Sequence, residues 1–286
     1  MYLRGIHAEE QIKPLLNFIQ QNPLGIFTTA IPSASHPLLQ SSHVPWVLDI
    51  ISDDADAPVK GRLRGHMARQ NPQAKAIIEA LQSSSSSTNT GDDVTGGGDG
   101  VLEQEVMVLF NGPHHHYVTP KFYVETKPAT AKVVPTWNYS AVQAYGKARI
   151  YHSSGSAATS EYLGQQMKDL TTLCETEIMG YTGEKGTTNG PWEVEDAPER
   201  YLEIMKKGVI GVEIEIERIG GKWKMSQEMS VGDRNGVAEG FKKLGTEVGI
   251  AISECVRERG EICDEAKRKA KERSLITRNQ LPGYKT

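Results

Sequence analysis

The chain has 286 residues, of which 38% are hydrophobic and 24% charged, and its formal net charge is −4 at pH 7. This length can bury one large core or two modest ones, so we expect a soluble globular protein. The small negative charge excludes a general attraction to nucleic acid, and direct nucleic-acid binding is not expected. No apolar run is long enough to span a membrane, and no signal-like stretch follows Met1, so we expect a cytoplasmic protein, with the nucleus as an alternative. An odd number of cysteines without a CxxC pair fits a reducing compartment: Cys174, Cys255 and Cys263.

Apolar residues recur at helical spacing between Ala8 and Gln21 and predict an amphipathic helix with one buried face: Ile12, Leu15, Leu16 and Ile19. Strands are predicted at residues 23–30 and 42–49, and Pro45 favours an edge or a bulge in the second. A further short strand at residues 62–67 runs into Asn71 and Pro72, which are typical of the cap and first residue of a helix. A strand that leads directly into a capped helix is a candidate phosphate site.

The segment from Ser83 to Gly100 is rich in serine, glycine and aspartate and predicts a disordered insert. Further strands are predicted at residues 105–110, 140–150 and 209–217, and helices at 159–178 and 196–205. Gly220 and Gly221 predict a tight turn into a last strand at 222–226. One helix is predicted from Arg234 to about Arg257, followed by a charged tail. The strands recur at intervals typical of a barrel, so a mainly β fold with helices is predicted.

Several blocks of the sequence occur together in a known family. They are Leu63–Gln73 (LRGHMARQNPQ), Lys132–Tyr139 (KVVPTWNY), Pro191–Pro198 (PWEVEDAP), Trp223–Gln227 (WKMSQ) and Asp233–Val237 (DRNGV). In these blocks, which span most of residues 1–245, the chain resembles the Pai family of protease-synthase and sporulation negative regulators. It departs from the family in the serine-rich insert, and in Glu228 and Met229, where the family pattern has polar residues beginning with Asn.

The resemblance implies an α+β, mainly β fold: an FMN-binding split β-barrel related to pyridoxamine-phosphate oxidases. The predicted domains are a split-barrel FMN-binding domain at residues 1–233, containing the disordered insert 83–100, and a C-terminal helix with a charged tail at residues 234–286. In such folds the flavin usually lies at a dimer interface, so the resemblance also implies a homodimer.

FMN needs a compensated phosphate, hydrogen bonds to the edge of its ring and an apolar wall against one ring face. Side-chain alternation places Arg64 and His66 on one strand face and Arg69 beyond it, and Arg69 with the helix start after Asn71 is the favoured phosphate site. The residues of this strand and turn predicted to bind the cofactor are Arg64, Gly65, His66, Met67, Ala68, Arg69 and Asn71.

Two other segments are predicted to reach the flavin ring. His43, Val44 and Pro45 offer backbone groups and an apolar edge, as the corresponding strand does in split barrels. By resemblance, Lys132, Trp137, Asn138 and Tyr139 reach a flavin held mainly by the partner subunit, although Trp137 and Tyr139 equally fit core or interface aromatics. No metal site is predicted, because the consecutive His114, His115 and His116 would point to opposite faces of a strand.

Three functions remain open at this stage. The first is an FMN-dependent oxidoreductase acting on a small molecule, in which His66 or Tyr139 donates or relays a proton. The second is a Pai-type negative transcriptional regulator without turnover, although no helix-turn-helix signature is evident. The third is a haem-binding or haem-degrading split barrel, with a histidine ligand from His43, His66 or the run at residues 114–116. The sequence identifies neither a substrate nor an electron donor.

Overall fold

The computed structural model describes residues 1–87 and 99–280, except for the side chains of 84–87 and 274–280. The chain forms two compact units. Unit 1 contains Met1–Glu9, Gly112–Ala141 and the chain from Gly221 onwards, and unit 2 contains Glu10–Asn111 and Val142–Gly220. Whether the segment after residue 233 folds separately stays a prediction.

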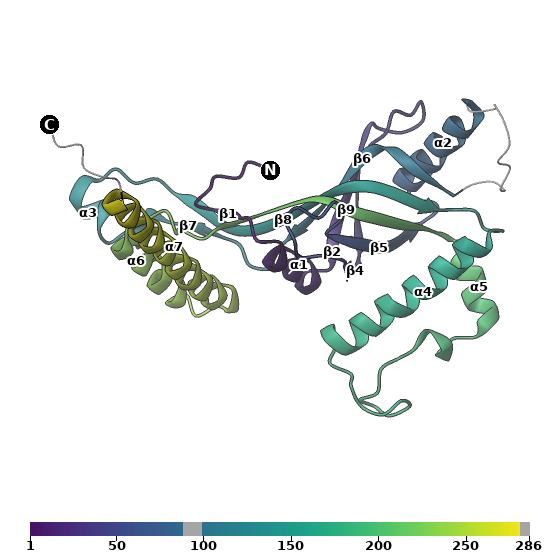
Figure 1. Ribbon diagram of the computed structural model, residues 1–286. Coiled ribbons are helices and arrows are strands. Elements are labelled where there is room, and N and C mark those ends of the chain that lie inside the picture. Colours follow the sequence, from purple (N-terminus) through teal and green to yellow (C-terminus); the bar gives the residue numbers. More distant parts are fainter. Residues whose placement is uncertain (88–98, 281–286) are drawn as a thin grey trace. The chain divides into compact units, whose positions relative to one another are not determined.

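Unit 2 is built on an antiparallel sheet (Figure 1). Its strands follow the order β3-β2-β6-β8-β9-β5-β4. The strands at the two ends of this order, β3 and β4, are consecutive in the chain and separated only by Trp46. This one stretch of chain pairs with β2 on one side and β5 on the other, so the sheet closes into a barrel. The strands are β2 (Leu24–Ala30), β3 (Leu39–Pro45), β4 (Val47–Ile50), β5 (Gly61–Ala68), β6 (Gly100–Asn111), β8 (Thr136–Tyr151) and β9 (Val209–Lys224).

The break between β3 and β4 confirms the irregularity predicted at Pro45. Proline has no N–H to donate to a ladder, so pairing with β2 ends there and pairing with β5 begins at Val47. Trp46 turns into the barrel core, where it is fully buried and meets Phe27 edge to face at 5.8 Å between ring centroids. The strand predicted at residues 42–49 is therefore present as two pieces.

Helix α1 (Ile12–Gln21) confirms the predicted apolar face, since Ile12, Leu15, Leu16 and Ile19 are all buried. It begins at Ile12 rather than Ala8, because Ala8 and Glu9 form the short strand β1 (Ala8–Glu9).

Helix α2 (Pro72–Ser87) begins as predicted, because the Asn71 side chain accepts a hydrogen bond from the Gln73 backbone N–H at 2.9 Å. The buried Gln73 amide donates to the backbone oxygens of Phe27 and Gln40 and so fixes the helix start against β2 and β3. The helix continues to Ser87, so the first residues of the predicted disordered insert are helical. Residues 88–98 of that insert lie outside the described residues.

A helical excursion joins β8 to β9 and contains α4 (Ala157–Leu173), the short turns η2 (Cys174–Ile178) and η3 (Val194–Asp196), and α5 (Glu199–Lys207). The start of α4 is held by Asp99, just before β6. The Asp99 carboxylate accepts hydrogen bonds from the backbone N–H groups of His152 and Ser153 and from the hydroxyl of Thr159. These bonds fix the angle at which α4 leaves the sheet.

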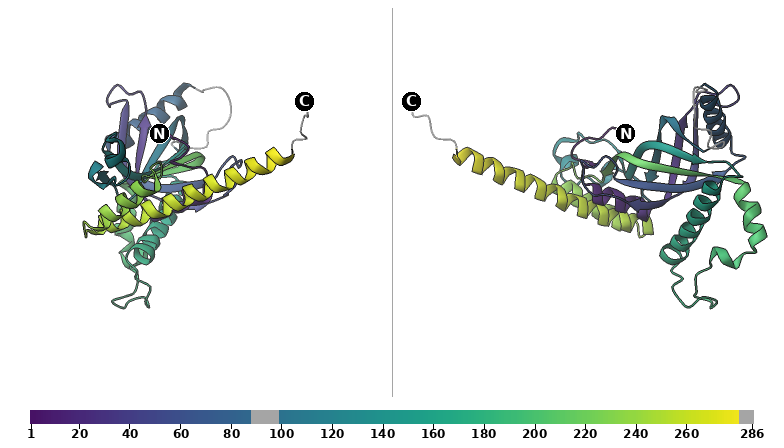
Figure 2. Two further views of the ribbon diagram at one scale, coloured as in Figure 1. Left: turned by 90° about the vertical axis from the view of Figure 1, so that its left-hand side faces the viewer. Right: turned by 45° about the vertical axis from the view of Figure 1, so that its right-hand side comes forward.

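Unit 1 pairs short strands with the remaining parts of β8 and β9 and adds a helical hairpin. β1 pairs with β9, and β7 (His116–Val118) pairs with β8. η1 (Pro120–Phe122) and α3 (Thr126–Thr130) precede the hairpin, which consists of α6 (Val231–Lys242) and the long α7 (Glu247–Gln280). The two hairpin helices lie side by side (Figure 2) around a buried seam of Val237, Phe241, Ile252 and Val256.

Two predictions about the C-terminal part are wrong. Gly220 and Gly221 do not form a turn, since β9 runs through them to Lys224, where Gly221 and Lys222 pair with β1. The single helix predicted at residues 234–257 is divided into α6 and α7, because Gly245 adopts a left-handed conformation (φ +66°) and Thr246 caps the next turn by accepting from the Gly249 N–H.

The predicted α+β class with a mainly antiparallel sheet is confirmed. Within the part of the chain that the structure describes, no helix has the length and apolar character needed to cross a bilayer.

Candidate functional site

The predicted site residues are divided between the two units, and each group has its own surroundings. His43, Val44, Pro45 and the residues from Arg64 to Asn71 belong to unit 2, whereas Lys132 and the Trp137–Tyr139 segment belong to unit 1.

Strand β5 alternates as its sequence predicts. Leu63, Gly65 and Met67 are buried in the barrel core, and an added side chain at Gly65 would meet Trp46 at 2.9 Å. Arg64 and His66 lie on the opposite face. The core face therefore leaves no space for a ligand at these positions, and any chemistry of β5 belongs to its polar face.

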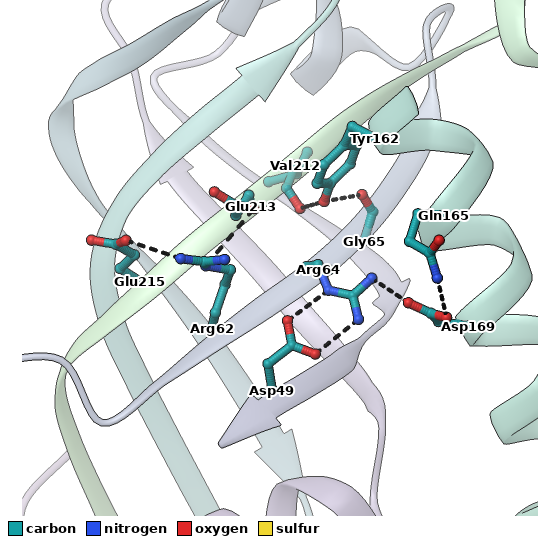
Figure 3. A network of polar contacts seen from close by, with 10 residues as sticks. All are labelled: Asp49, Arg62, Arg64, Gly65, Tyr162, Gln165, Asp169, Val212, Glu213 and Glu215. Atoms are coloured by element: carbon teal, nitrogen blue, oxygen red, sulfur yellow. Dashed lines mark hydrogen bonds and ion pairs between the residues drawn. The ribbon is translucent and has the colours of Figure 1, made fainter. Parts of the chain in front are cut away.

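On that polar face, Arg64 is held by two carboxylates (Figure 3). Its Nε and Nη2 donate to both oxygens of Asp49 at 2.7 and 2.8 Å, and its Nη1 donates to Asp169 of α4 at 2.7 Å. The hydrogen bond to Asp49 raises the pKa of the Arg64 guanidinium above its ordinary value. Since two negative charges already surround one positive charge, a phosphate would have to displace a carboxylate to bind here.

His66 also faces α4. Its Nδ1 lies 2.5 Å from the Gln166 Oε1, and Gln166 is fully buried. Burial lowers the pKa of His66 below its ordinary value, so the imidazole is neutral at pH 7. In this arrangement the His66 ring is bonded to α4 and is partly exposed.

Arg69, the favoured phosphate residue, uses its guanidinium within the fold. It donates to the backbone carbonyls of His152 at 2.5 Å, Lys207 at 3.3 Å and Val209 at 3.4 Å. It therefore joins the turn after β5 to the end of β8 and the start of β9. Ala68 is exposed beside it and pairs with Val209.

Asn71 is likewise occupied, because its side chain caps α2 and donates to the Ser42 hydroxyl at 2.8 Å. On β3, Val44 is buried in the core, whereas His43 is exposed and Pro45 is partly exposed. Of the residues predicted in unit 2, His43 and Ala68 are the exposed ones.

In unit 1, the start of β8 presents aromatic rings. The indole of Trp137 is 52% exposed and meets the ring of Tyr117 edge to face at 6.3 Å between centroids. The ring centroid of His115 lies 5.9 Å from that of the same indole. Tyr139 is partly exposed, and the Lys132 side chain is exposed. Trp137 therefore offers an open aromatic face of the kind that a planar ligand can stack against.

Asn138, between the two aromatics, is fully buried. The hydroxyl of Ser226 donates to its Oδ1 at 3.1 Å, and its Nδ2 has no hydrogen-bond partner among the described residues. Ser226 itself has a left-handed backbone (φ +61°). The fold thus brings the sequence blocks Lys132–Tyr139 and Trp223–Gln227 together, and leaves a buried donor unused at their junction.

Two lysines beside this junction were not predicted as site residues. Lys222 is buried between the rings of Tyr139 and Tyr2, and Lys224 donates to the Thr136 hydroxyl and to the Trp137 carbonyl. The sequence predicted a turn at Gly220 and Gly221, directly before both lysines. Because β9 continues through these glycines, the prediction did not show that the lysines lie on β9. The alternation of Lys222 and Lys224 around Trp223 was the signal that could have identified them.

A pocket beside α4, lined by Lys168, Trp192 and Glu195 among others, has a volume of about 120 Å³. This is smaller than the several hundred Å³ typical of cofactor sites. No group of three His, Cys, Asp or Glu side chains in residues 1–87 and 99–280 is arranged to hold a metal ion.

Comparison with known proteins places this geometry in context. Residues 1–218 match the family model described as "Putative FMN-binding domain". An uncharacterised protein of Aspergillus fumigatus is 57% identical over 268 residues, covering 92% of this chain and 99% of that protein. The protease synthase and sporulation protein PAI 2 of Bacillus subtilis is 27% identical over 238 residues, covering 83% of this chain and 86% of that protein. Among solved structures, the flavocytochrome Anf3 of Azotobacter vinelandii is 10% identical with a TM-score of 0.39, covering 78% of this chain and 72% of that one.

Proposed function

The chain belongs to the FMN-binding family whose model matches residues 1–218, and from this membership we propose that it binds FMN and exchanges electrons between the flavin and a small molecule. The predicted resemblance to an FMN-binding split-barrel family is thereby confirmed. The family match is the observation that carries the proposal, and the closed antiparallel sheet of unit 2 agrees with it.

The residues of unit 1 fit an aromatic, anionic cofactor better than those on the polar face of β5. The exposed Trp137 indole offers a stacking surface, and the Asn138 Nδ2 is a buried donor without a partner. Arg64 and Arg69, in contrast, are already bonded to carboxylates and to backbone carbonyls. We therefore assign ring contact to Trp137, and contact of His43 and Pro45 with the flavin stays a prediction from sequence.

FMN, when bound, supplies hydride or single-electron transfer through its ring system. The protein has to orient the substrate and supply a proton. Tyr139 and His66 are both partly exposed, and Tyr139 is the better placed of the two predicted proton donors because the His66 ring is bonded to the buried Gln166 of α4. We assign proton donation to the Tyr139 Oη, and the predicted homodimer remains part of the proposal.

A second candidate function is a regulator whose flavin does not turn over. The similarity to the Bacillus subtilis protein PAI 2, named as a protease synthase and sporulation protein, supports it. In this case FMN would stabilise the protein without being reduced by a metabolite.

One experiment distinguishes the two. The purified protein is loaded with FMN, kept free of oxygen and mixed with NADH or NADPH, and then with a small acceptor such as a quinone. For an oxidoreductase, the flavin absorbance falls on reduction and returns on addition of the acceptor, and the Tyr139→Phe variant is slower with unchanged FMN affinity. A flavin that binds tightly but is never reduced under these conditions supports the regulator.

A further inference from the structure

Lys222 is a buried cation that has no carboxylate partner in the part of the chain that the structure describes. The residue is only 9% exposed, and its Nζ donates to the Tyr2 backbone carbonyl at 3.2 Å. The same Nζ lies 5.8 Å from the ring centroid of Tyr2 and 5.5 Å from that of Tyr139. An ammonium has three N–H donors, and one acceptor is recorded for it among the described residues. The charge is therefore shielded by ring faces and a neutral carbonyl alone.

Lys224, two residues further along β9, is partly buried and close enough to Lys222 to be affected by its charge. Besides its bonds to Thr136 and Trp137, its Nζ has one carboxylate nearby, that of Glu228 at 3.9 Å. The same carboxylate lies 3.1 Å from the Nε2 of His7. Burial lowers the pKa of Lys224, and Lys222 lowers it further, against the attraction of Glu228. The one carboxylate in ion-pair distance of these two ammonium groups, among the described residues, is that of Glu228 beside Lys224, so positive charge is in excess.

Two arginines of unit 1, the buried Arg234 and the partly exposed Arg259, do have carboxylate partners. Arg234 is bonded by Asp264, and Arg259 is paired with Glu9 at 3.0 Å. Burial of a charge is unfavourable unless an opposite charge and hydrogen bonds compensate it, and buried lysines are rare for this reason. The same unit that pairs its arginines leaves Lys222 uncompensated, which indicates an anionic group bound from outside the chain.

We propose that Lys222 and Lys224 bind a phosphate group. A phosphate monoester carries a charge of about −1.5 to −2 at neutral pH and several acceptor oxygens, which matches two ammonium groups with free donors. Resting on the proposed function, the phosphate is that of FMN, and free phosphate is the alternative source. The site lies beyond residue 218, where the family match ends.

The first test uses inorganic phosphate without flavin. Melting temperature is measured in phosphate and in chloride at equal ionic strength, for the wild type, for Lys222→Met with Lys224→Met, and for the exposed control Lys243→Met. Methionine keeps the apolar stem of lysine. Phosphate should raise the melting temperature of the wild type and the control, but not of the double variant. An equal rise in all three proteins, or none in the wild type, overturns the site.

The second test compares FMN with riboflavin, which lacks the phosphate, by quenching of flavin fluorescence. The double variant should bind FMN about 10- to 100-fold more weakly, as expected for the loss of charge-assisted hydrogen bonds, and riboflavin equally well. If FMN binds wild type and double variant alike, this inference fails while the proposed function stands. If phosphate binds at the lysines but no flavin binds, the site stands and the proposed function fails.

The third measurement covers the possibility that the double variant does not fold. The single variant Lys222→Arg keeps the charge and should retain the preference for FMN over riboflavin, whereas Lys222→Met alone should reduce it. Loss of the preference in Lys222→Arg with full retention in Lys222→Met would contradict the proposal.

Discussion

The hydroxyl of Ser226 donates a hydrogen bond to the side-chain carbonyl of Asn138 at 3.1 Å, and both residues are fully buried. This contact joins the start of β8 to the segment after β9, which are 88 residues apart in the chain. The blocks Lys132–Tyr139 and Trp223–Gln227, which are far apart in the sequence, are thus in contact within unit 1.

Ser226→Ala should lower the free energy of unfolding by about 1 to 3 kcal/mol, because it leaves the buried Asn138 amide without a partner for its oxygen. Urea denaturation measures the effect. Ser41→Ala is a suitable control, since its hydroxyl bonds Thr28 on the surface and its loss should change stability little. If the two substitutions lower the free energy of unfolding equally, the buried hydrogen bond contributes no more to stability than the exposed one.

Arg64 should prove structural. Arg64→Met removes the partner of Asp49 and Asp169 and should destabilise the protein by about 3 kcal/mol, whereas breaking the exposed pair of Arg218 and Glu105 by Arg218→Met should cost less than about 1 kcal/mol. FMN affinity of the folded Arg64→Met protein should equal that of the wild type. If Arg64→Met has normal stability but binds FMN much more weakly, Arg64 binds the phosphate as the sequence predicted.

Arg69→Ala separates the sequence-based prediction from the geometry. The sequence predicts a phosphate ligand, and the bonds from Arg69 to three backbone carbonyls predict a lower melting temperature with little change in FMN affinity. Both quantities are measured on the same preparation. Weaker FMN binding at unchanged melting temperature would contradict the structural role.

Asp99 should make stability depend on acid pH. Burial alone would raise its pKa, but the hydrogen bonds from Ser153, Thr159 and His152 lower it below its ordinary value. A carboxylate with a depressed folded-state pKa contributes stability above its unfolded pKa of about 4, and this contribution is lost as pH falls through the folded-state pKa.

Asp99→Asn should therefore destabilise the protein at pH 7 and flatten the loss of stability below about pH 4. Thermal denaturation across the acid range measures both effects. Parallel pH profiles for variant and wild type would show that another carboxylate dominates acid unfolding.

Local patterns predicted much of the fold. The apolar face of α1, the alternation of β5 and the cap at Asn71 depend on side chains within a few residues of one another, and each is present as predicted. Gly245 was missed because one glycine inside an otherwise helical pattern does not reveal its backbone angle. Gly220 and Gly221 were misread because the short partner strand β1, which keeps β9 extended there, comes from the other end of the chain.

The candidate site was harder to predict for the same reason. The pattern correctly placed Arg64 and His66 on one face of β5, but it could not show that Asp49 and Asp169 would compensate Arg64 or that Gln166 would bond to His66. The environment of Lys222 depends on Tyr2 and Tyr139, which lie far from it in sequence. Whether a charged side chain is compensated depends on residues that are distant in the sequence, so it can be determined only from the folded structure.

The most direct test of the central claim is the ultraviolet-visible spectrum of the purified protein, before and after addition of FMN, with the mass of any chromophore released by heat. We predict flavin absorbance and released FMN in an amount equal to that of the chain, or saturable binding of added FMN. A colourless protein that does not bind added FMN would contradict the account, and a haem absorbance band would favour the alternative ligand.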